Sequence, residues 1–186
     1  MNEETRQLII AAQEGDDSAF HKIVALHDER IMLLALQITQ NEQDAEDVYQ
    51  ETFIKTYKNL KKFRFESEIY TWMYRIAVNT AYNFKRKQSK MQMIEPTQSD
   101  NRDHIDQITE SNSIDNSSQE FTKAVRASLH LLPRQQRTVF ILKHLQNLKI
   151  KDIASILNIS DGTVKKYLFR AVEKLQVALK EYNYAQ

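Results

Sequence analysis

Residues 63–87 read FRFESEIYTWMYRIAVNTAYNFKRK. Nine of the chain's 17 aromatic residues lie between Phe53 and Phe84, and residues 55–90 hold ten Lys and Arg against two Glu. Aromatic rings stack on unpaired bases, and cations interleaved with them follow the phosphates of a single strand. Ser67 is a good N-cap, so we expect a short basic loop followed by a long helix over residues 68–87. The stretch therefore predicts a helical platform for single-stranded nucleic acid.

Helix is the predicted secondary structure almost throughout the chain. Only two Gly and two Pro occur among 186 residues, and no sustained apolar alternation marks a strand. Apolar residues at helical spacing over residues 5–40 indicate helices that break at residues 15–18, where Asp17 or Ser18 is expected to cap the second one. The fold class is therefore all-α.

Charge is segregated along the chain, although the formal net charge is only +1. Residues 1–54 hold 3 basic and 12 acidic side chains (−9), and residues 55–90 hold 10 and 2 (+8). Residues 91–120 hold 1 and 7 (−6), and residues 121–186 hold 12 and 4 (+8). Solvated helix faces would explain one such block. Four blocks in alternation indicate different partners for different segments.

The third of these blocks is polar and poor in apolar residues. Such a segment cannot bury enough apolar surface to offset its ordering entropy, so residues 91–120 are predicted to form a flexible acidic linker. Residues 1–90 and 121–186 are then two small helical domains, an N-terminal bundle and a C-terminal helix-turn-helix domain. The chain shows no signal-peptide pattern and no apolar run long enough to span a bilayer, so a cytoplasmic protein without membrane insertion is expected.

The C-terminal domain carries the pattern of a helix-turn-helix over residues 150–171. Asn158 stands where the turn needs a left-handed residue, and Ser160 is placed to cap the second helix. Val164 and Leu168 are expected on the inner face of that helix. A helical hairpin with basic exposed residues remains the plain alternative. The outer face would enter the major groove of duplex DNA with Lys165, Lys166, Tyr167, Phe169 and Arg170.

A helix over residues 45–60, with Asn41 or Asp44 as its cap, begins with an acidic run. Clustered carboxylates suit a divalent metal or general acid–base chemistry. The chain has no Cys, however, and its five His residues lie elsewhere, so no further ligands join this cluster. A docking patch for a basic protein surface is the simpler interpretation, and no metal, cofactor or catalytic residue is predicted.

The order and separation of these motifs closely resemble the extracytoplasmic-function (ECF) sigma factors of bacterial RNA polymerase, over nearly the full chain. The matching segments are DAED at 44–47, QETF at 50–53, YTW at 70–72, YRIA at 74–77, NTA at 79–81, LP at 132–133, QR at 136–137 and GTVK at 162–165.

This resemblance implies a transcription initiation factor that binds core RNA polymerase and directs it to specific promoters. The acidic helix would dock on the clamp helices of the β′ subunit, and the β subunit is a further expected contact. The residues implied in docking are Asp44, Glu46, Asp47, Gln50 and Glu51.

The loop and the long helix would hold the melted minus-ten promoter element, with one flipped base in a pocket at the loop. Core packing is the favoured role for Trp72 and Ile76, and it is also an alternative for Tyr74. Lys85 is a further candidate contact. The DNA-binding residues that the resemblance implies are Lys62, Phe63, Arg64, Phe65, Glu66, Ser67, Tyr70, Arg75, Asn79, Asn83, Arg86 and Lys87.

The helix-turn-helix would read the minus-thirty-five element, and the acidic linker would thread the polymerase channel that later carries RNA. Many members of the family are held inactive by an anti-sigma factor, which is therefore an expected partner. Phe65 stands where the family usually has a small residue, and Lys149 where it usually has a Ser cap. The residues implied in reading duplex DNA are Thr163, Lys165, Lys166, Tyr167, Phe169 and Arg170.

Two alternatives belong to other functional classes. A stand-alone transcriptional regulator would use the helix-turn-helix to bind operator DNA, without an acidic docking helix or a single-strand platform. A nucleic-acid enzyme would use the carboxylates at residues 44–51 with a divalent metal. Tight duplex binding without polymerase would favour the first, and metal-dependent cleavage would favour the second.

Overall fold

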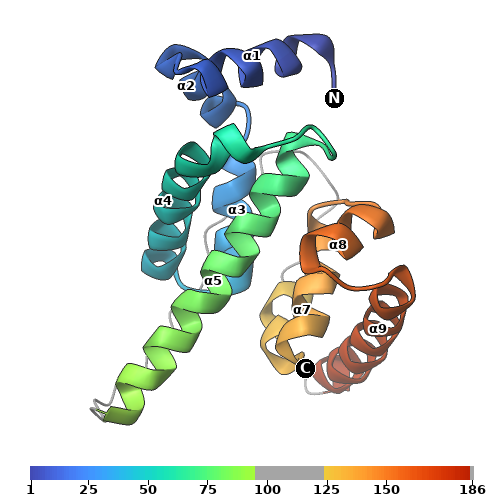
Figure 1. Ribbon diagram of the computed structural model, residues 1–186. Coiled ribbons are helices and arrows are strands. Elements are labelled where there is room, and N and C mark those ends of the chain that lie inside the picture. The colour runs from blue at the N-terminus through green and yellow to red at the C-terminus, as the bar shows by residue number, and fades with distance from the viewer. Residues whose placement is uncertain (95–123, 185–186) are drawn as a thin grey trace. The chain divides into compact units, whose positions relative to one another are not determined.

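The computed structural model describes the backbone of residues 1–94 and 124–184 and the side chains of residues 1–87 and 124–180. Within these residues every regular element is helical, which confirms the all-α prediction (Figure 1). The chain divides into two compact units, Met1–Ile105 and Asp106–Gln186. Most of the predicted acidic linker lies outside the described residues. None of the helices in the described part is long and apolar enough to cross a membrane.

The N-terminal unit is built around three helices that pack against one another, α3, α4 and α5. The helices α1 and α2 form a pair beside them, and α1 also contacts the short helix η1 that follows α4. The bounds are α1 Glu3–Glu14, α2 Asp17–Ala25, α3 Asp28–Thr39, α4 Glu42–Asn59, η1 Leu60–Lys62 and α5 Ile69–Ile94.

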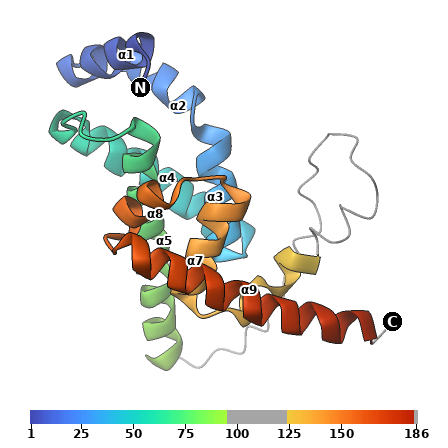
Figure 2. The ribbon, with the colours of Figure 1, turned by 90° about the vertical axis from the view of Figure 1, so that its right-hand side faces the viewer.

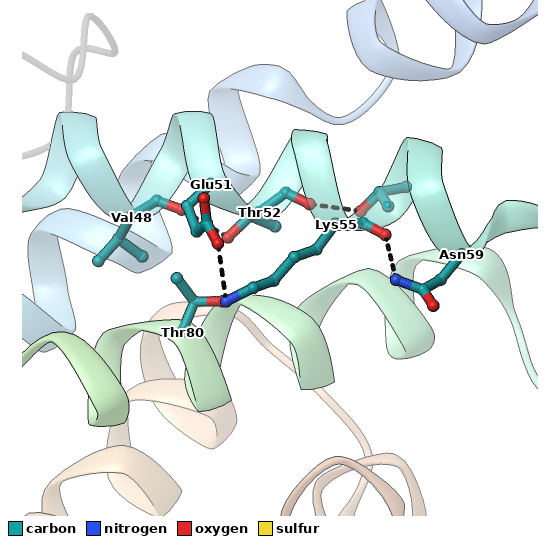
Figure 3. Close-up of polar contacts among 7 residues, drawn as sticks. Val48, Glu51, Thr52, Lys55, Asn59 and Thr80 are labelled. Carbon is teal, nitrogen blue, oxygen red and sulfur yellow. Dashed lines mark hydrogen bonds and ion pairs between the residues drawn. The ribbon is translucent and has the colours of Figure 1, made fainter.

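Side chains from all three central helices fill the core of this unit. Leu34 of α3, Val48 of α4 and Met73 of α5 are fully buried. Burying one such side chain contributes about 1.5–3 kcal/mol, so the three-helix contact carries much of the stability of the unit. Thr52 and Thr56 are also buried, and each hydroxyl donates to the carbonyl four residues earlier on α4, at 2.6 and 2.8 Å (Figure 3). These bonds satisfy the two hydroxyls, which would otherwise be costly to bury.

The start of the chain differs from the prediction in two ways. Asp16 rather than Asp17 or Ser18 caps α2, because its carboxylate accepts from the backbone N–H of Ala19 at 3.1 Å. A break between α2 and α3 at His27 was not predicted. No Gly, Pro or side-chain cap marks it, and the polar residues 27–30 that interrupt the apolar spacing are the one sign of it in the sequence. Of the two caps predicted for α4, Asn41 is confirmed, since its side chain accepts from the N–H of Asp44 at 2.8 Å.

The predicted cap of the long helix is also wrong. The helix α5 begins at Ile69, and the Ser67 hydroxyl donates to the carbonyl of Glu68 at 3.3 Å instead of accepting from the first turn. The helix then continues to Ile94, beyond the predicted end at residue 87. A side-chain hydroxyl that is placed to cap a helix can also bond to its neighbours, and sequence alone does not separate the two arrangements.

The C-terminal unit wraps short helices around one long helix. Residues 124–128 are helical, and α9 packs against α7 and α8, as Figure 2 shows. The run from Thr138 to Leu142 is buried on every side, which is typical of a helix in the centre of a core. The further bounds are η2 Leu129–Leu131, α7 Arg134–Phe140, the π-helical η3 Ile141–Leu145, α8 Ile150–Leu157 and α9 Asp161–Tyr184.

The helix-turn-helix has the predicted local geometry. Asn158 is left-handed, with φ 54° and ψ 49°, and ends α8. The backbone N–H of Ile159 donates back to Ala154 at 3.1 Å, which closes the turn. The Ser160 hydroxyl accepts from the N–H of Thr163 at 3.1 Å and caps α9. Val164 is fully buried on the inner face, as expected.

Candidate nucleic-acid interface

The acidic residues of α4 gather on the side of the helix that faces away from the core. Ala45, Val48 and Thr52 are fully buried on the opposite side, so the helical repeat turns the intervening residues outward. Asp44 is half-buried at the start of the helix. We call the exposed group the acidic face, and it consists of Glu46, Asp47, Gln50 and Glu51.

One member of the acidic face is already engaged. The Lys55 ammonium lies 3.2 Å from the Glu51 carboxylate and donates to the Thr80 hydroxyl of α5 at 3.2 Å (Figure 3). A partly exposed pair of this kind is worth well under about 1 kcal/mol, but it offsets the negative charge of Glu51. Glu46 and Asp47 make no ion pair within the described part of the chain, so they present the stronger negative charge.

An exposed apolar side chain extends the acidic face, and sequence reasoning missed it. Ile54 is 45% exposed and lies one turn after Gln50 on the same side of α4. Ile54 lies four residues after the exposed Gln50 and out of register with the buried Val48 and Thr52. This spacing is the sequence signal that would have predicted its exposure.

The loop between η1 and α5, residues 63–68, contains a cluster of aromatic rings. The Phe63 ring centroid lies 5.1 Å from that of Phe65 and 5.4 Å from that of Trp72 on α5. Phe63 is only 5% exposed, so it supports the cluster from below, whereas Phe65 is half-buried. Lys62, Arg64 and Glu66, by contrast, are exposed, and Ser67 is half-buried.

Exposed polar residues run along α5 at intervals of three or four. Met73 and Ala77 lie on the opposite, buried side, so the polar residues share the outer side of the helix. Tyr70 and Lys85 are half-buried. We call this group the α5 stripe, and it consists of Arg75, Asn79, Asn83, Arg86 and Lys87.

The aromatic residues of α5 depart in part from their predicted roles. Trp72 and Ile76, expected in the core, are only half-buried, and by helical spacing they lie beside the α5 stripe. Tyr74 is the residue that is buried, at 2% exposure. Burial raises the pKa of Tyr74 to about 12, so its phenol stays neutral at physiological pH.

The outer side of α9 carries exposed cations around an exposed ring. Phe169 is 65% exposed, which is unusual for a Phe in a helix with a core-facing side. Two predicted contact residues are engaged within the unit. The Tyr167 hydroxyl donates to Gln135 of α7 at 2.7 Å, and the Thr163 and Ser160 hydroxyls lie 2.9 Å apart. The recognition face therefore consists of Lys165, Lys166, Phe169 and Arg170.

Comparison with known families gives this arrangement its context. Residues 23–91 match the family described as Sigma-70 region 2, and residues 122–175 match Sigma-70, region 4. An ECF RNA polymerase sigma-E factor of Haemophilus influenzae is 35% identical over 175 residues, which cover 91% of this chain and 92% of that protein. The chain belongs to the ECF sigma factors of the sigma-70 family.

Two further similarities agree with this membership. The RNA polymerase sigma-H factor of Pseudomonas aeruginosa is 34% identical over 182 residues, covering 95% of this chain and 94% of that protein. The fold matches that of the sigma factor RpoE of Bartonella quintana, solved with the anti-sigma factor NepR, with a TM-score of 0.74 and 24% identity over 87% of this chain and 96% of that one.

Membership decides between the functional classes. A sigma factor is a non-catalytic transcription initiation factor that directs RNA polymerase to promoters, so the stand-alone regulator and the nucleic-acid enzyme are both set aside. A stand-alone regulator would not carry region 2 in addition to a helix-turn-helix. Within the described residues of this sigma factor, no three His, Asp or Glu side chains are grouped to hold a metal ion.

Proposed function

We propose that each part of this sigma factor has its own role in transcription initiation. Residues 1–90 bind core polymerase and melt and hold the minus-ten element, residues 121–186 read the minus-thirty-five element, and residues 91–120 link the two. The partners are core RNA polymerase and promoter DNA, and the site of action is the cytoplasm, where both are found. What carries the proposal is that one unit presents an acidic face and a separate basic, aromatic surface, each suited to a different partner.

The acidic face and Asp44 are proposed to dock on the clamp helices of the β′ subunit. Exposed carboxylates steer a basic partner and fix its orientation. An apolar side chain beside them supplies contact area that is desolvated on docking, and Ile54 is placed to do this. Glu46 and Asp47 should contribute more than Glu51, because Lys55 already offsets the charge of Glu51.

The melted minus-ten strand is proposed to bind the loop at residues 63–68 and the α5 stripe. Extruding a base costs a few kcal/mol, and stacking of a base on an aromatic side chain returns about 1–3 kcal/mol. Phe65 is placed to stack because it is half-exposed, whereas buried Phe63 acts by supporting it. Arg75 and Arg86 of the stripe supply cations for the phosphates.

The recognition face is proposed to read the minus-thirty-five element as duplex DNA. A helix of this size fits the major groove and contacts bases with the residues of its first turns. Arg170 is suited to a bidentate contact with guanine, and Phe169 to apolar contact with a thymine methyl group. Tyr167 and Thr163 are expected to orient α9 rather than to contact bases, because their hydroxyls are engaged within the unit.

The test is run-off transcription with purified core polymerase on a pool of genomic promoter fragments, with and without this protein. Transcripts that depend on the protein and come from few promoters support the proposal, and their sequences give both promoter elements. If no transcript appears and the protein does not co-elute with core polymerase, the proposed function is wrong.

Charge reversal separates docking from DNA binding. The double variant Glu46→Lys with Asp47→Lys should lose core-polymerase binding, because both side chains lie on the exposed acidic face. The control Glu14→Lys changes an exposed carboxylate on α1, away from that face, and should bind as the wild type does. Equal binding by the double variant would refute the docking role of α4.

An anti-sigma factor is a further proposed partner. The sigma factor RpoE of Bartonella quintana, which shares this fold, was solved with one bound. Such a partner would act by covering the acidic face or the α5 stripe. Its addition should abolish run-off transcription, and a partner that binds without inhibiting would contradict this role.

A further inference from the structure

The loop at residues 63–68 is held by a residue far away in sequence. The carboxamide of Gln13 on α1 donates to the carbonyl of Leu60 and to that of Phe63, each at 2.9 Å. An amide nitrogen carries two hydrogens, so both donors of Gln13 are used on this one segment. The two carbonyls mark the start of η1 and the start of the loop, so Gln13 fixes the direction in which the chain leaves η1.

A second contact from α1 reaches the middle of the same loop. The Arg6 guanidinium carbon lies 5.0 Å from the centroid of the Phe65 ring, within the range of a cation–π interaction. Phe65 has φ 60°, in the left-handed region that a bulky residue rarely adopts. An uncommon backbone conformation persists only where its surroundings hold it. The contacts of Phe65 with Arg6 and with Phe63 provide such surroundings.

We propose that α1 holds the loop at residues 63–68 in place, with Gln13 as a positioning residue and Arg6 as a second contact. We call these two contacts the brace. The brace holds the half-exposed Phe65 ring in one orientation before DNA arrives. A loop that is already ordered binds more tightly, because its ordering entropy is lost on folding rather than on binding. The inference rests on the proposed function, since the ligand of the loop is the single-stranded minus-ten element.

The experiment uses the holoenzyme formed by the full chain and core polymerase. The probe is a fluorescein-labelled single-stranded oligonucleotide that carries the non-template minus-ten sequence of a promoter identified by run-off transcription. Fluorescence anisotropy gives its Kd, and a base-scrambled oligonucleotide gives the specificity ratio. Core-polymerase affinity is also measured for each variant. The unfolding transition of Trp72 fluorescence is measured on the free protein, in which Trp72 is the only Trp and lies in this unit.

Two substitutions remove the brace in different ways. Gln13→Ala deletes both donors, and Gln13→Glu keeps the shape but sets a carboxylate against two carbonyl oxygens. We expect each to weaken oligonucleotide binding about tenfold and to lower the specificity ratio, with core-polymerase affinity unchanged. The matched control is Gln7→Ala, because Gln7 is an exposed Gln on the same helix and, among the described residues, its amide bonds only to Glu3, at 2.7 Å.

Substitution of Arg6 tests the second contact of the brace without disturbing the fold. Arg6 is exposed, so Arg6→Ala should leave the unit folded while weakening oligonucleotide binding about threefold. Arg6→Lys should restore part of the loss, because a Lys cation also interacts with a ring face. In a Phe65→Gly background, where no side-chain ring has to be held, the effect of Arg6→Ala should vanish.

The outcomes separate this inference from the proposed function. Wild-type oligonucleotide affinity in the Gln13 and Arg6 variants would overturn the brace while leaving the proposed function intact. A Gln13 variant that loses oligonucleotide and core-polymerase affinity in equal proportion would also overturn it, because that is the signature of a folding defect. A wild-type holoenzyme that binds no minus-ten oligonucleotide would refute both the brace and the proposed binding of the melted strand at this loop, whereas the run-off assay tests the sigma-factor function itself.

Discussion

The two candidate DNA-binding surfaces are held in place in different ways. In the helix-turn-helix, the contacts that form the turn are local: the N–H of Ile159 donates to the carbonyl of Ala154, and the Ser160 hydroxyl accepts from the N–H of Thr163. In the N-terminal unit, the loop that leads into α5 depends on Gln13, which lies 47 and 50 residues away from its two acceptors. The turn of the helix-turn-helix is therefore specified over a few residues, although Tyr167 of α9 also bonds to Gln135 of α7. The proposed single-strand site depends more strongly on contacts between distant segments.

Each surface also contains a left-handed residue, and the two residues differ in kind. Asn158 adopts this conformation at little cost, because its short polar side chain tolerates it. Phe65 adopts the same conformation without such a side chain, and being left-handed costs a bulky residue about 1–2 kcal/mol. The first conformation is explained by the residue itself and the second only by its neighbours.

The largest effect is expected from a charge placed in the core of one unit, which tests whether the two units unfold independently. Val164 is fully buried, so Val164→Asp should destabilise the C-terminal unit by roughly 3–5 kcal/mol. Far-ultraviolet circular dichroism should show loss of helix. Trp72 fluorescence, which reports on the other unit, should show an unchanged urea transition.

The control for this variant is Lys174→Asp, which places the same side chain on the exposed side of the same helix. It should change the free energy of unfolding by less than about 0.5 kcal/mol. If Val164→Asp also shifted the Trp72 transition, the two units would be coupled in their folding, and the stability of each would not depend on its own contacts alone.

A smaller effect is expected at the turn of the helix-turn-helix. Asn158→Val should lower the free energy of unfolding of the C-terminal unit by about 1–2 kcal/mol, because a β-branched residue is disfavoured at φ 54°. Asn158→Gly should be neutral or slightly stabilising. Urea unfolding followed by circular dichroism measures both, and equal stability of the Val and Gly variants would show that the turn is not set locally.

Loss of a helix cap should lower the free energy of unfolding by a similar amount in the two units. Ser160→Ala removes the cap of α9 and Asn41→Ala that of α4, and each should cost about 1 kcal/mol. Circular dichroism follows the first and Trp72 fluorescence the second. Ser18→Ala is the control, because Ser18 is exposed and does not cap α2. A cost for Ser18→Ala equal to that of the two caps would undermine the assignment of Asp16.

The smallest effect is a pH dependence of the N-terminal unit. Burial, followed by the charge of Arg30, lowers the pKa of His27 below 6.5, and Asp28 opposes this only in part. Its Nδ1 is buried without a hydrogen-bond partner among the described residues. The unfolded state therefore takes up a proton first as the pH falls through 6.5, so the free energy of unfolding is highest above that pH and decreases below it.

His27→Gln should remove this part of the acid sensitivity, while His21→Gln, at an exposed position on α2, should retain it. Urea transitions of Trp72 fluorescence on either side of pH 6.5 make the comparison. Identical pH profiles for the wild type and His27→Gln would show that His27 is not the group responsible.

Much of the architecture could be predicted because it depends on residues close in sequence. The scarcity of Gly and Pro predicted an all-α fold, and Asn158 and Ser160 predicted the turn and the cap that the structure shows. The break at His27 was missed, because no Gly, Pro or side-chain cap marks it and the polar run at 27–30 is only a weak signal. Ser67 gave the opposite error, a local signal that the surroundings of the loop override.

The sequence by itself determined the helical fold, the segregation of charge and the membership in the sigma-70 family, since composition, spacing and motif order are properties of the chain. Only the tertiary structure decided that Tyr74 rather than Trp72 is buried, that Lys55 offsets the charge of Glu51, and that Gln13 reaches the loop. Helical periodicity states which residues share a side of a helix. Which helix covers that side depends on contacts between segments far apart in the chain, and no pattern within one segment specifies them.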